Sequence, residues 1–158
     1  MKQSEPIKRS HQLAPLSREH HDALVFLLRI KQGLKNGTPI KIISEYINWF
    51  WTNNLNNHFQ QEERLLLPHL SSDNELASQL KTEHKTIRDL ASRELSESDI
   101  VTLSNVLNVH IRFEERILFP HIERKIAIDQ LNNIFEQLDH PVQCQNSWDN
   151  KFWRYKKQ

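Results

Sequence analysis

Apolar residues recur every three or four positions over most of the chain, the spacing that puts them on one face of an α-helix. Helix caps and stop signals divide this pattern into four long stretches and one short stretch. The predicted helices cover residues 17–36, 39–67, 75–95, 100–118 and 126–138. We therefore expect an all-α protein, an up-down four-helix bundle with a short extra C-terminal helix.

Two stretches of the pattern carry the same motif. His58, Glu62, Glu63 and Arg64 are followed by three apolar residues, proline and histidine, and the same order begins at His110. Residues four apart lie on one face of a helix, so each histidine is expected to point the same way as the glutamate one turn later. An imidazole and a carboxylate placed in this way are ligands for a divalent metal.

The other two long stretches each offer a further histidine. In the third it is His84, which follows Glu83, and in the first it is either His20 or His21, which follow Glu19. Apolar residues lie three, six and seven positions beyond His84, and they do so beyond His20 and beyond His21 as well. Four imidazoles and two carboxylates inside a bundle would make a plausible dinuclear metal site.

Composition limits the other functions. The chain has 158 residues, enough for one domain with a core, and its few glycines and prolines favour long helices. Its formal net charge is +1 and its only cysteine is Cys144, so we expect no nucleic-acid partner and no intrachain disulfide. No apolar run suggests a membrane span or secretory leader, and a cytoplasmic location is the default expectation.

The organisation expected along the chain has three parts. Residues 1–14 lack periodicity and are expected to form a flexible arm, residues 15–140 the metal-binding bundle, and residues 141–158 a basic, aromatic tail. In the first helix we expect Leu24, Leu27 and Leu28 to form the buried stripe. Glu63 and Glu115 lie about 140° around the helix from His58 and His110, so they should face solvent, pair with basic neighbours or orient the site from outside.

The repeated motif and the paired histidines together resemble the hemerythrin-like, or HHE cation-binding, domain family, over roughly residues 16–125. The family's first-helix motif is similar to Glu-x-His-x-x-Leu and matches Glu19 to Leu24 at His21, which favours His21 over His20. The resemblance implies six metal ligands: His21, His58, Glu62, His84, His110 and Glu114. Oxygen-carrying hemerythrins have a second third-helix histidine where this chain has Arg88, so the chain is more similar to the four-His, two-Glu branch.

The resemblance implies a non-haem, carboxylate-bridged centre of two irons, and the ligand types would also suit Mn or Zn. On this reading the protein binds or senses O2, NO or a related small species, with a diatomic ligand or peroxide as its partner. The alternative is a di-iron redox enzyme acting on NO or peroxide, or an iron donor in the repair of iron centres. The residues indicate neither an oligomeric state nor a role for the tail.

Overall fold

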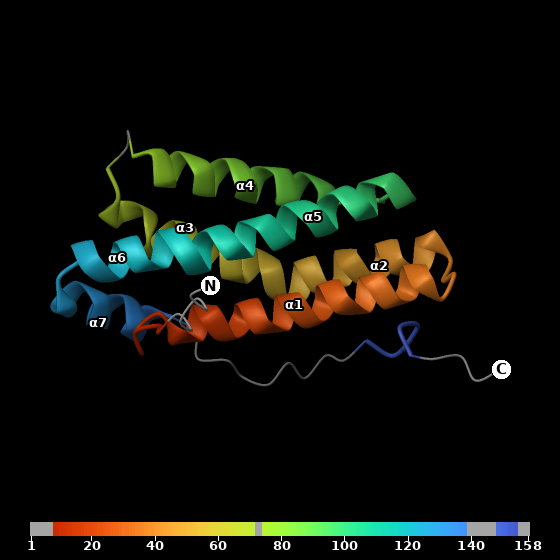
Figure 1. Cartoon of the computed structure of the whole chain (residues 1–158), viewed down its shortest axis with the longest axis horizontal. Helices are drawn as coiled ribbons and strands as arrows, with labels where there is room; N and C mark the ends of the chain where they lie inside the picture. The colour runs from red at the N-terminus through yellow and green to blue at the C-terminus, as the bar shows by residue number, and fades with distance from the viewer. Residues whose placement is uncertain (1–7, 72–73, 139–147, 155–158) are drawn as a thin grey trace, which may run out of the picture.

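The computed structural model describes residues 8–71, 74–138 and 148–154, and the regular structure within these ranges is entirely helical. The elements are α1 (Ala14–Lys35), α2 (Ile40–Phe50), η1 (Trp51–Leu55), α3 (Asn56–Leu65), η2 (Leu67–His69), α4 (Glu75–Ala91), α5 (Glu97–Phe113), η3 (Glu114–Leu118), α6 (Phe119–Lys125) and α7 (Ile128–Gln137). Figure 1 shows long helical segments lying alongside one another. The all-α prediction is confirmed, and the up-down order of four helices remains a prediction. None of the helices in the described ranges is long and apolar enough to cross a membrane.

Two of the long helical segments contain a π-helical turn. The first, η1, covers the asparagine-rich run, where Thr52 and Asn53 donate side-chain hydrogen bonds to backbone carbonyls one turn earlier, at 2.9 and 2.8 Å. The second, η3, precedes Pro120, whose ring cannot follow a regular α-helical turn without a clash. The helix therefore continues past Pro120 into α6, whereas at Pro68 the chain turns into the short 3₁₀ helix η2.

The apolar core has two parts, and every long helical segment contributes to both. One cluster includes Phe26 and Phe59, and the other includes Leu16, Leu80 and Phe119. In Figure 1 α1 lies beside α5, and both helices have contacts with other members of the bundle. The stretches between the two apolar clusters carry the histidines and glutamates of the repeated motif, so polar residues interrupt the core at mid-length.

The buried face of α1 differs from the expected stripe. Leu24 and Leu28 are 44% and 55% exposed, whereas Ala23, Phe26 and Ile30 are each 1% exposed. Successive helical residues differ by about 100° around the axis, so a shift of one position moves a residue from the core to the surface. The expectation for Leu24 and Leu28 was therefore wrong, and the helix is turned by about one residue.

The segment before α1 lies against the bundle. Leu13 is fully buried, Gln12 is 4% exposed, and the Gln12 side-chain amide donates to Asn132 of α7 at 3.0 Å. Residues 12 and 13 of the arm expected over residues 1–14 thus lie against the bundle, and residues 1–7 lie outside the described part of the chain. The expected helix start at Ser17 moves to Ala14, because Pro15 suits the first turn of a helix.

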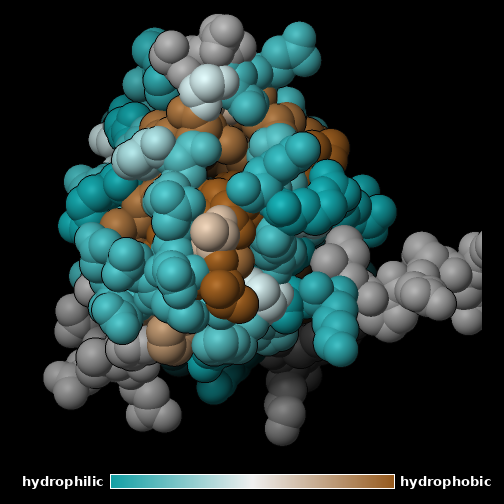
Figure 2. Space-filling model, turned by 90° about the vertical axis from the view of Figure 1, so that its left-hand side faces the viewer, coloured by the Kyte–Doolittle hydropathy of each residue, from teal (hydrophilic) through white to brown (hydrophobic). Residues whose placement is uncertain are grey.

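Apolar side chains reach the surface at the end of the molecule that α6 and α7 form. Figure 2 looks onto this end and shows apolar residues in the middle of a mostly polar surface. Leu67, Leu70 and Ile126 are partly buried there against the second core cluster, and Ile128 is 66% exposed. At this end, partly exposed apolar side chains form the boundary between the second core cluster and solvent.

The described part of the tail packs on the other core cluster. Trp148, Phe152 and Trp153 lie against its residues, and the ring centroid of Phe152 is 5.2 Å from that of Tyr46. Asn36 donates to the backbone carbonyls of Phe152 and Arg154 at 3.1 and 3.0 Å, which ties this segment to the end of α1. The close approach requires a glycine, because a Cβ at Gly33 would lie 2.5 Å from the Phe152 ring.

We predict that Gly33→Ala displaces the tail from α1. Alanine is a better helix former than glycine by about 1 kcal/mol, which offsets part of the cost of its clash with Phe152. The position of the tail is therefore a better readout than the stability of the protein. Tryptophan fluorescence should shift to the red as Trp148 and Trp153 lose contacts. The control is Gly37→Ala, at a residue with φ of 73° and no neighbour within 4 Å, which should strain the backbone and leave the fluorescence unchanged. An unshifted spectrum in Gly33→Ala would contradict this packing.

Candidate metal centre

Six buried side chains, from four helical segments, meet in the middle of the bundle. They form two overlapping groups whose candidate ligand atoms lie within 4.8 Å of one another. The groups are His20, His58, Glu62 and Glu114, and Glu62, His84, His110 and Glu114. Each of these residues is at most 3% exposed, so the cluster is removed from solvent.

The cluster brings together all the sequence-predicted residues except one. His58 and Glu62 project from one turn of α3, His84 comes from α4, and His110 and Glu114 span the junction of α5 and η3. The first-helix position is occupied by His20, which is 3% exposed, whereas His21 lies on the exposed face of α1. The structure therefore brings His20, and not the predicted His21, into the cluster, for the same reason that Leu24 is exposed: α1 is turned by about one residue.

A signal in the sequence could have selected His20. Both candidate helices contain the dipeptide Glu-His, as Glu19-His20 in α1 and Glu83-His84 in α4. If the two halves of the chain repeat each other, aligning these dipeptides puts His20, and not His21, opposite His84. The structure explains why the glutamates repeat as well as the histidines.

Every histidine of the cluster has an outer carboxylate at its Nδ1 atom. Glu115 contacts His20 at 2.7 Å and Glu83 contacts His110 at 2.8 Å, both as hydrogen bonds. The other two contacts are longer: Nδ1 of His58 lies 3.4 Å from a carboxylate oxygen of Glu19, and Nδ1 of His84 lies 3.5 Å from one of Glu63. An imidazole that donates its Nδ1 proton outward leaves Nε2 free to bind a metal, so Glu115 and Glu83 select for His20 and His110 the ring orientation that a metal site needs.

The outer contacts follow an approximate twofold pattern. Glu19 and Glu83 each precede one histidine and contact the histidine of the motif in their own half, His58 or His110. Glu63 and Glu115 each follow an inner glutamate and contact the lone histidine of the opposite half. The expected outside role of Glu63 and Glu115 is thus seen in the contacts, whereas the roles of Glu19 and Glu83 were missed.

The inward-facing atoms of the cluster have no hydrogen-bond partners. This holds for Nε2 of each of the four histidines and for both carboxylate oxygens of Glu62 and Glu114. Buried polar atoms left unpaired cost free energy, and ionised ones cost more. Cations placed among these atoms would satisfy all of them, and imidazole nitrogen with carboxylate oxygen suits Fe, Mn or Zn. The residues present therefore fit a metal centre.

The protonation of the cluster reflects burial and close charges. Burial by itself would lower the pKa of His58, but the carboxylates of Glu62 and Glu19 together outweigh it and raise that pKa to about 10. Burial would by itself raise the pKa of Glu62, but the adjacent imidazoles of His58 and His84 together bring it well below its usual range. At His110 burial dominates and lowers the pKa to about 4. A metal binding at His58 therefore has to replace a proton there.

Aromatic rings pack on the histidines from inside the bundle. Phe59 stacks on His84 with ring centroids 3.9 Å apart, and Phe119 stacks on His20 at 5.4 Å. Both phenylalanines are almost fully buried. These contacts restrict the rotation of the imidazoles and keep water away from the cluster.

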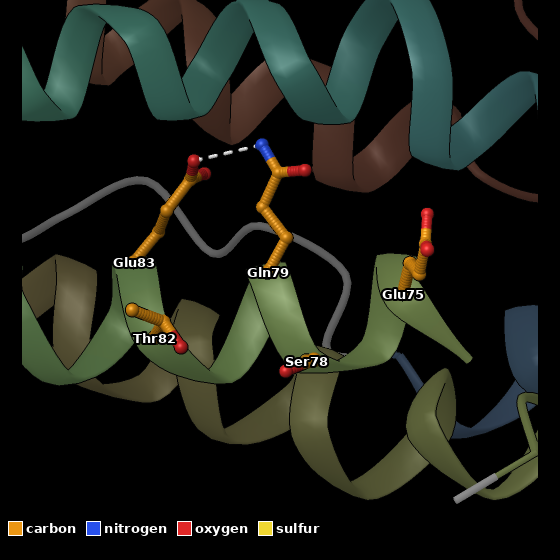
Figure 3. Close-up of a pocket in the computed structure, with 5 residues that line it drawn as sticks. All are labelled: Glu75, Ser78, Gln79, Thr82 and Glu83. Atoms are coloured by element: carbon orange, nitrogen blue, oxygen red, sulfur yellow. Dashed lines mark hydrogen bonds between the residues drawn. The ribbon is translucent and has the colours of Figure 1, made fainter. Parts of the chain in front are cut away.

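One outer carboxylate also lines a surface groove. The groove follows α4, has a volume of about 360 Å³, and is lined by polar residues: Glu75, Ser78, Gln79, Thr82 and Glu83. Figure 3 shows Gln79 donating to Glu83, at 3.0 Å. The other oxygen of Glu83 contacts His110, so this carboxylate lies between solvent and the cluster.

Comparison with known proteins agrees with this arrangement. The family model for the hemerythrin HHE cation binding domain matches residues 11–122, which is most of the chain. No curated protein and no solved structure matches. The matched range contains all six residues of the cluster and all four outer carboxylates, and four histidines with two inner glutamates are consistent with the four-His, two-Glu branch. The chain therefore belongs to the hemerythrin HHE cation-binding domain family.

Proposed function

We propose that the cluster binds two iron ions and that the loaded centre binds or senses O2, NO or a related small species. One iron would be held by His20 and His58 and the other by His84 and His110. Glu62 and Glu114 would bridge the two. Iron held in this way supplies open coordination positions and reversible one-electron chemistry for a small ligand.

The orientation of the two inner carboxylates carries this proposal. Nε2 of His20 lies 4.0 Å from Oε2 of Glu62 and 3.7 Å from Oε2 of Glu114. Nε2 of His84 instead faces the other oxygens, Oε1 of Glu62 at 3.2 Å and Oε1 of Glu114 at 3.8 Å. Glu114 thus presents one oxygen to His20 and the other to His84. Oε1 of Glu62 also lies 3.3 Å from Nε2 of His58, so this oxygen contacts both pairs of histidines. Both carboxylates therefore lie between the two pairs, the position that a bridging ligand requires.

The charge around the cluster supports two cations. Two inner and four outer glutamates surround the imidazoles, and two guanidinium groups, from Arg9 and Arg88, pair with the outer ones. Glu123 shares Arg9 with Glu115, so with neutral imidazoles the seven glutamates and two arginines leave five negative charges, most of which two divalent cations would balance. A single divalent cation would balance the two fully buried inner carboxylates, and a second would offset the partly buried outer ones.

The burial of the cluster supports a small ligand. The inner residues are at most 3% exposed, and Phe59 and Phe119 cover two of the imidazoles. An organic substrate would have to displace these packed rings, whereas a diatomic molecule could reach the centre through ordinary side-chain motion. The apolar rings would favour uncharged species such as O2 or NO over charged ones.

The assignment of His20 generates a paired prediction. Adding ferrous iron to metal-free protein should stabilise it by about 3–4 kcal/mol when the free metal is 100 to 1,000 times the Kd. His20→Ala should lose much of this stabilisation, because it removes a ligand, and His21→Ala should keep it, because that ring is exposed. Thermal unfolding with and without metal measures both. If His21→Ala loses the stabilisation by iron and His20→Ala keeps it, His21 is the ligand instead.

The proposed activity generates a second prediction. Protein loaded with ferrous iron without oxygen should change its visible absorption on addition of NO or O2, and His84→Ala, which removes a buried ligand, should reduce the change. Stopped-flow absorption spectroscopy measures the response, with His21→Ala as the matched control. An iron-loaded protein that gives no response to either gas would contradict the proposal. Steady turnover of peroxide or NO would favour the redox-enzyme alternative.

A further inference from the structure

The side chain of Arg9 lies close to the cluster although it comes from the segment before α1. It is 9% exposed, an unusual degree of burial for an arginine. Its Nη2 donates to the Glu115 carboxylate at 2.9 Å and to the Glu115 backbone carbonyl, and its Nη1 donates to Glu123 at 2.5 Å. Arg9 thus fixes the backbone and the side chain of Glu115 together.

Arg9 contacts the surroundings of His20 by two routes. The first passes through Glu115, whose other oxygen receives the 2.7 Å contact from Nδ1 of His20. The second passes through Phe119: the guanidinium lies 5.2 Å from the centre of that ring, which in turn stacks on His20. Both routes restrict the rotation of one imidazole of the cluster.

The other half of the cluster has an arginine in the corresponding role, but it is held less tightly. Arg88 donates to the Glu63 carboxylate at 3.2 and 3.5 Å, and its side chain is 37% exposed. Glu63 in turn lies 3.5 Å from Nδ1 of His84, compared with 2.7 Å for Glu115 and His20. Solvent screens an exposed pair, so its effect on the histidine should be smaller.

We propose that Arg9 is a positioning residue that raises the affinity of one half of the cluster, the half containing His20 and His58, for a divalent cation. This inference rests on the proposed metal centre and makes its two halves unequal. A ring already held with Nε2 facing inward loses less freedom when a cation binds. A direct outer partner such as Glu115 typically contributes about 10- to 100-fold to metal affinity, and Arg9, which acts through Glu115, should contribute at the lower end of that range. The charge of Arg9 lies between the carboxylates of Glu115 and Glu123, which offset its repulsion of the cation.

The test compares Arg9→Met with Arg88→Met in otherwise complete protein. Methionine keeps much of the apolar stem and removes the charge and the donors. Metal-free protein is titrated with Zn2+ by calorimetry, with a competing chelator for tight binding. Wild type should bind two Zn2+ ions, Arg9→Met should bind one of them about 10-fold more weakly, and Arg88→Met should stay within about two-fold of wild type. Equal losses in the two variants, or no loss in Arg9→Met, would overturn the inference.

A second readout identifies the half affected. In histidine-ring NMR spectra of the Zn2+-loaded protein, the slowly exchanging Nδ1 proton of His20 should broaden or disappear in Arg9→Met, while that of His110 persists. Asn132→Ala is the control for simple docking of the segment, because it removes the hydrogen bond to Gln12 and leaves Arg9 in place. If Asn132→Ala weakens Zn2+ binding as much as Arg9→Met does, Arg9 only docks the segment and the inference fails.

If Arg9→Met does not fold, Arg9→Lys is the alternative variant. Lysine keeps the positive charge but lacks the planar guanidinium that spans Glu115 and Glu123. Arg9→Lys should therefore show a smaller loss of Zn2+ affinity, again at the half that contains His20 and His58. Absence of that loss would overturn the inference. Wild type that binds no Zn2+ or Fe2+ would refute the metal centre itself, whereas wild type with two ions and an unaffected Arg9→Met would refute only the role of Arg9.

Discussion

The burial of two carboxylates among four imidazoles is the constraint on which the rest of the structure depends. Glu62 and Glu114 are fully buried, and their oxygens have no hydrogen-bond donors. Such a cluster is expensive in an apolar core unless opposite charge compensates it. It also divides the core into two apolar clusters, one at each end of the long helical segments. The apolar ends of each helical segment therefore stabilise the fold, and the middle of each segment supplies the histidines and glutamates of the cluster.

The outer contacts explain how the cluster is kept in order. Each imidazole is held between an inner and an outer carboxylate, so the ring that could bind a metal is already oriented by its surroundings. The approximate twofold repeat of these contacts lets two similar halves of the chain build one centre. Arg9 breaks the repeat, because the segment before α1 has a buried arginine where α4 provides an exposed one.

The sequence predicted the parts of this centre that depend on local spacing. His58 with Glu62, and His110 with Glu114, are one helical turn apart, so their common direction follows from the helix alone. The choice between His20 and His21 depends on the rotation of α1 against its neighbours, and the apolar stripe expected there was wrong for Leu24 and Leu28, whereas Leu27 packs against the core. The contact of Arg9 with Glu115 joins residues 106 positions apart, and no local pattern reveals it. The helices were predictable for the same reason as the motif pairs, and the π turns at η1 and η3 were not.

The most direct test of the central claim is the iron content of protein reconstituted with ferrous iron without oxygen, combined with X-ray absorption at the iron edge. We expect about two irons per chain, mixed nitrogen and oxygen ligands, and a short iron–iron distance from carboxylate bridging. Glu62→Ala should lose the iron–iron signal. One iron per chain without that signal in the native protein, or none, would contradict the account.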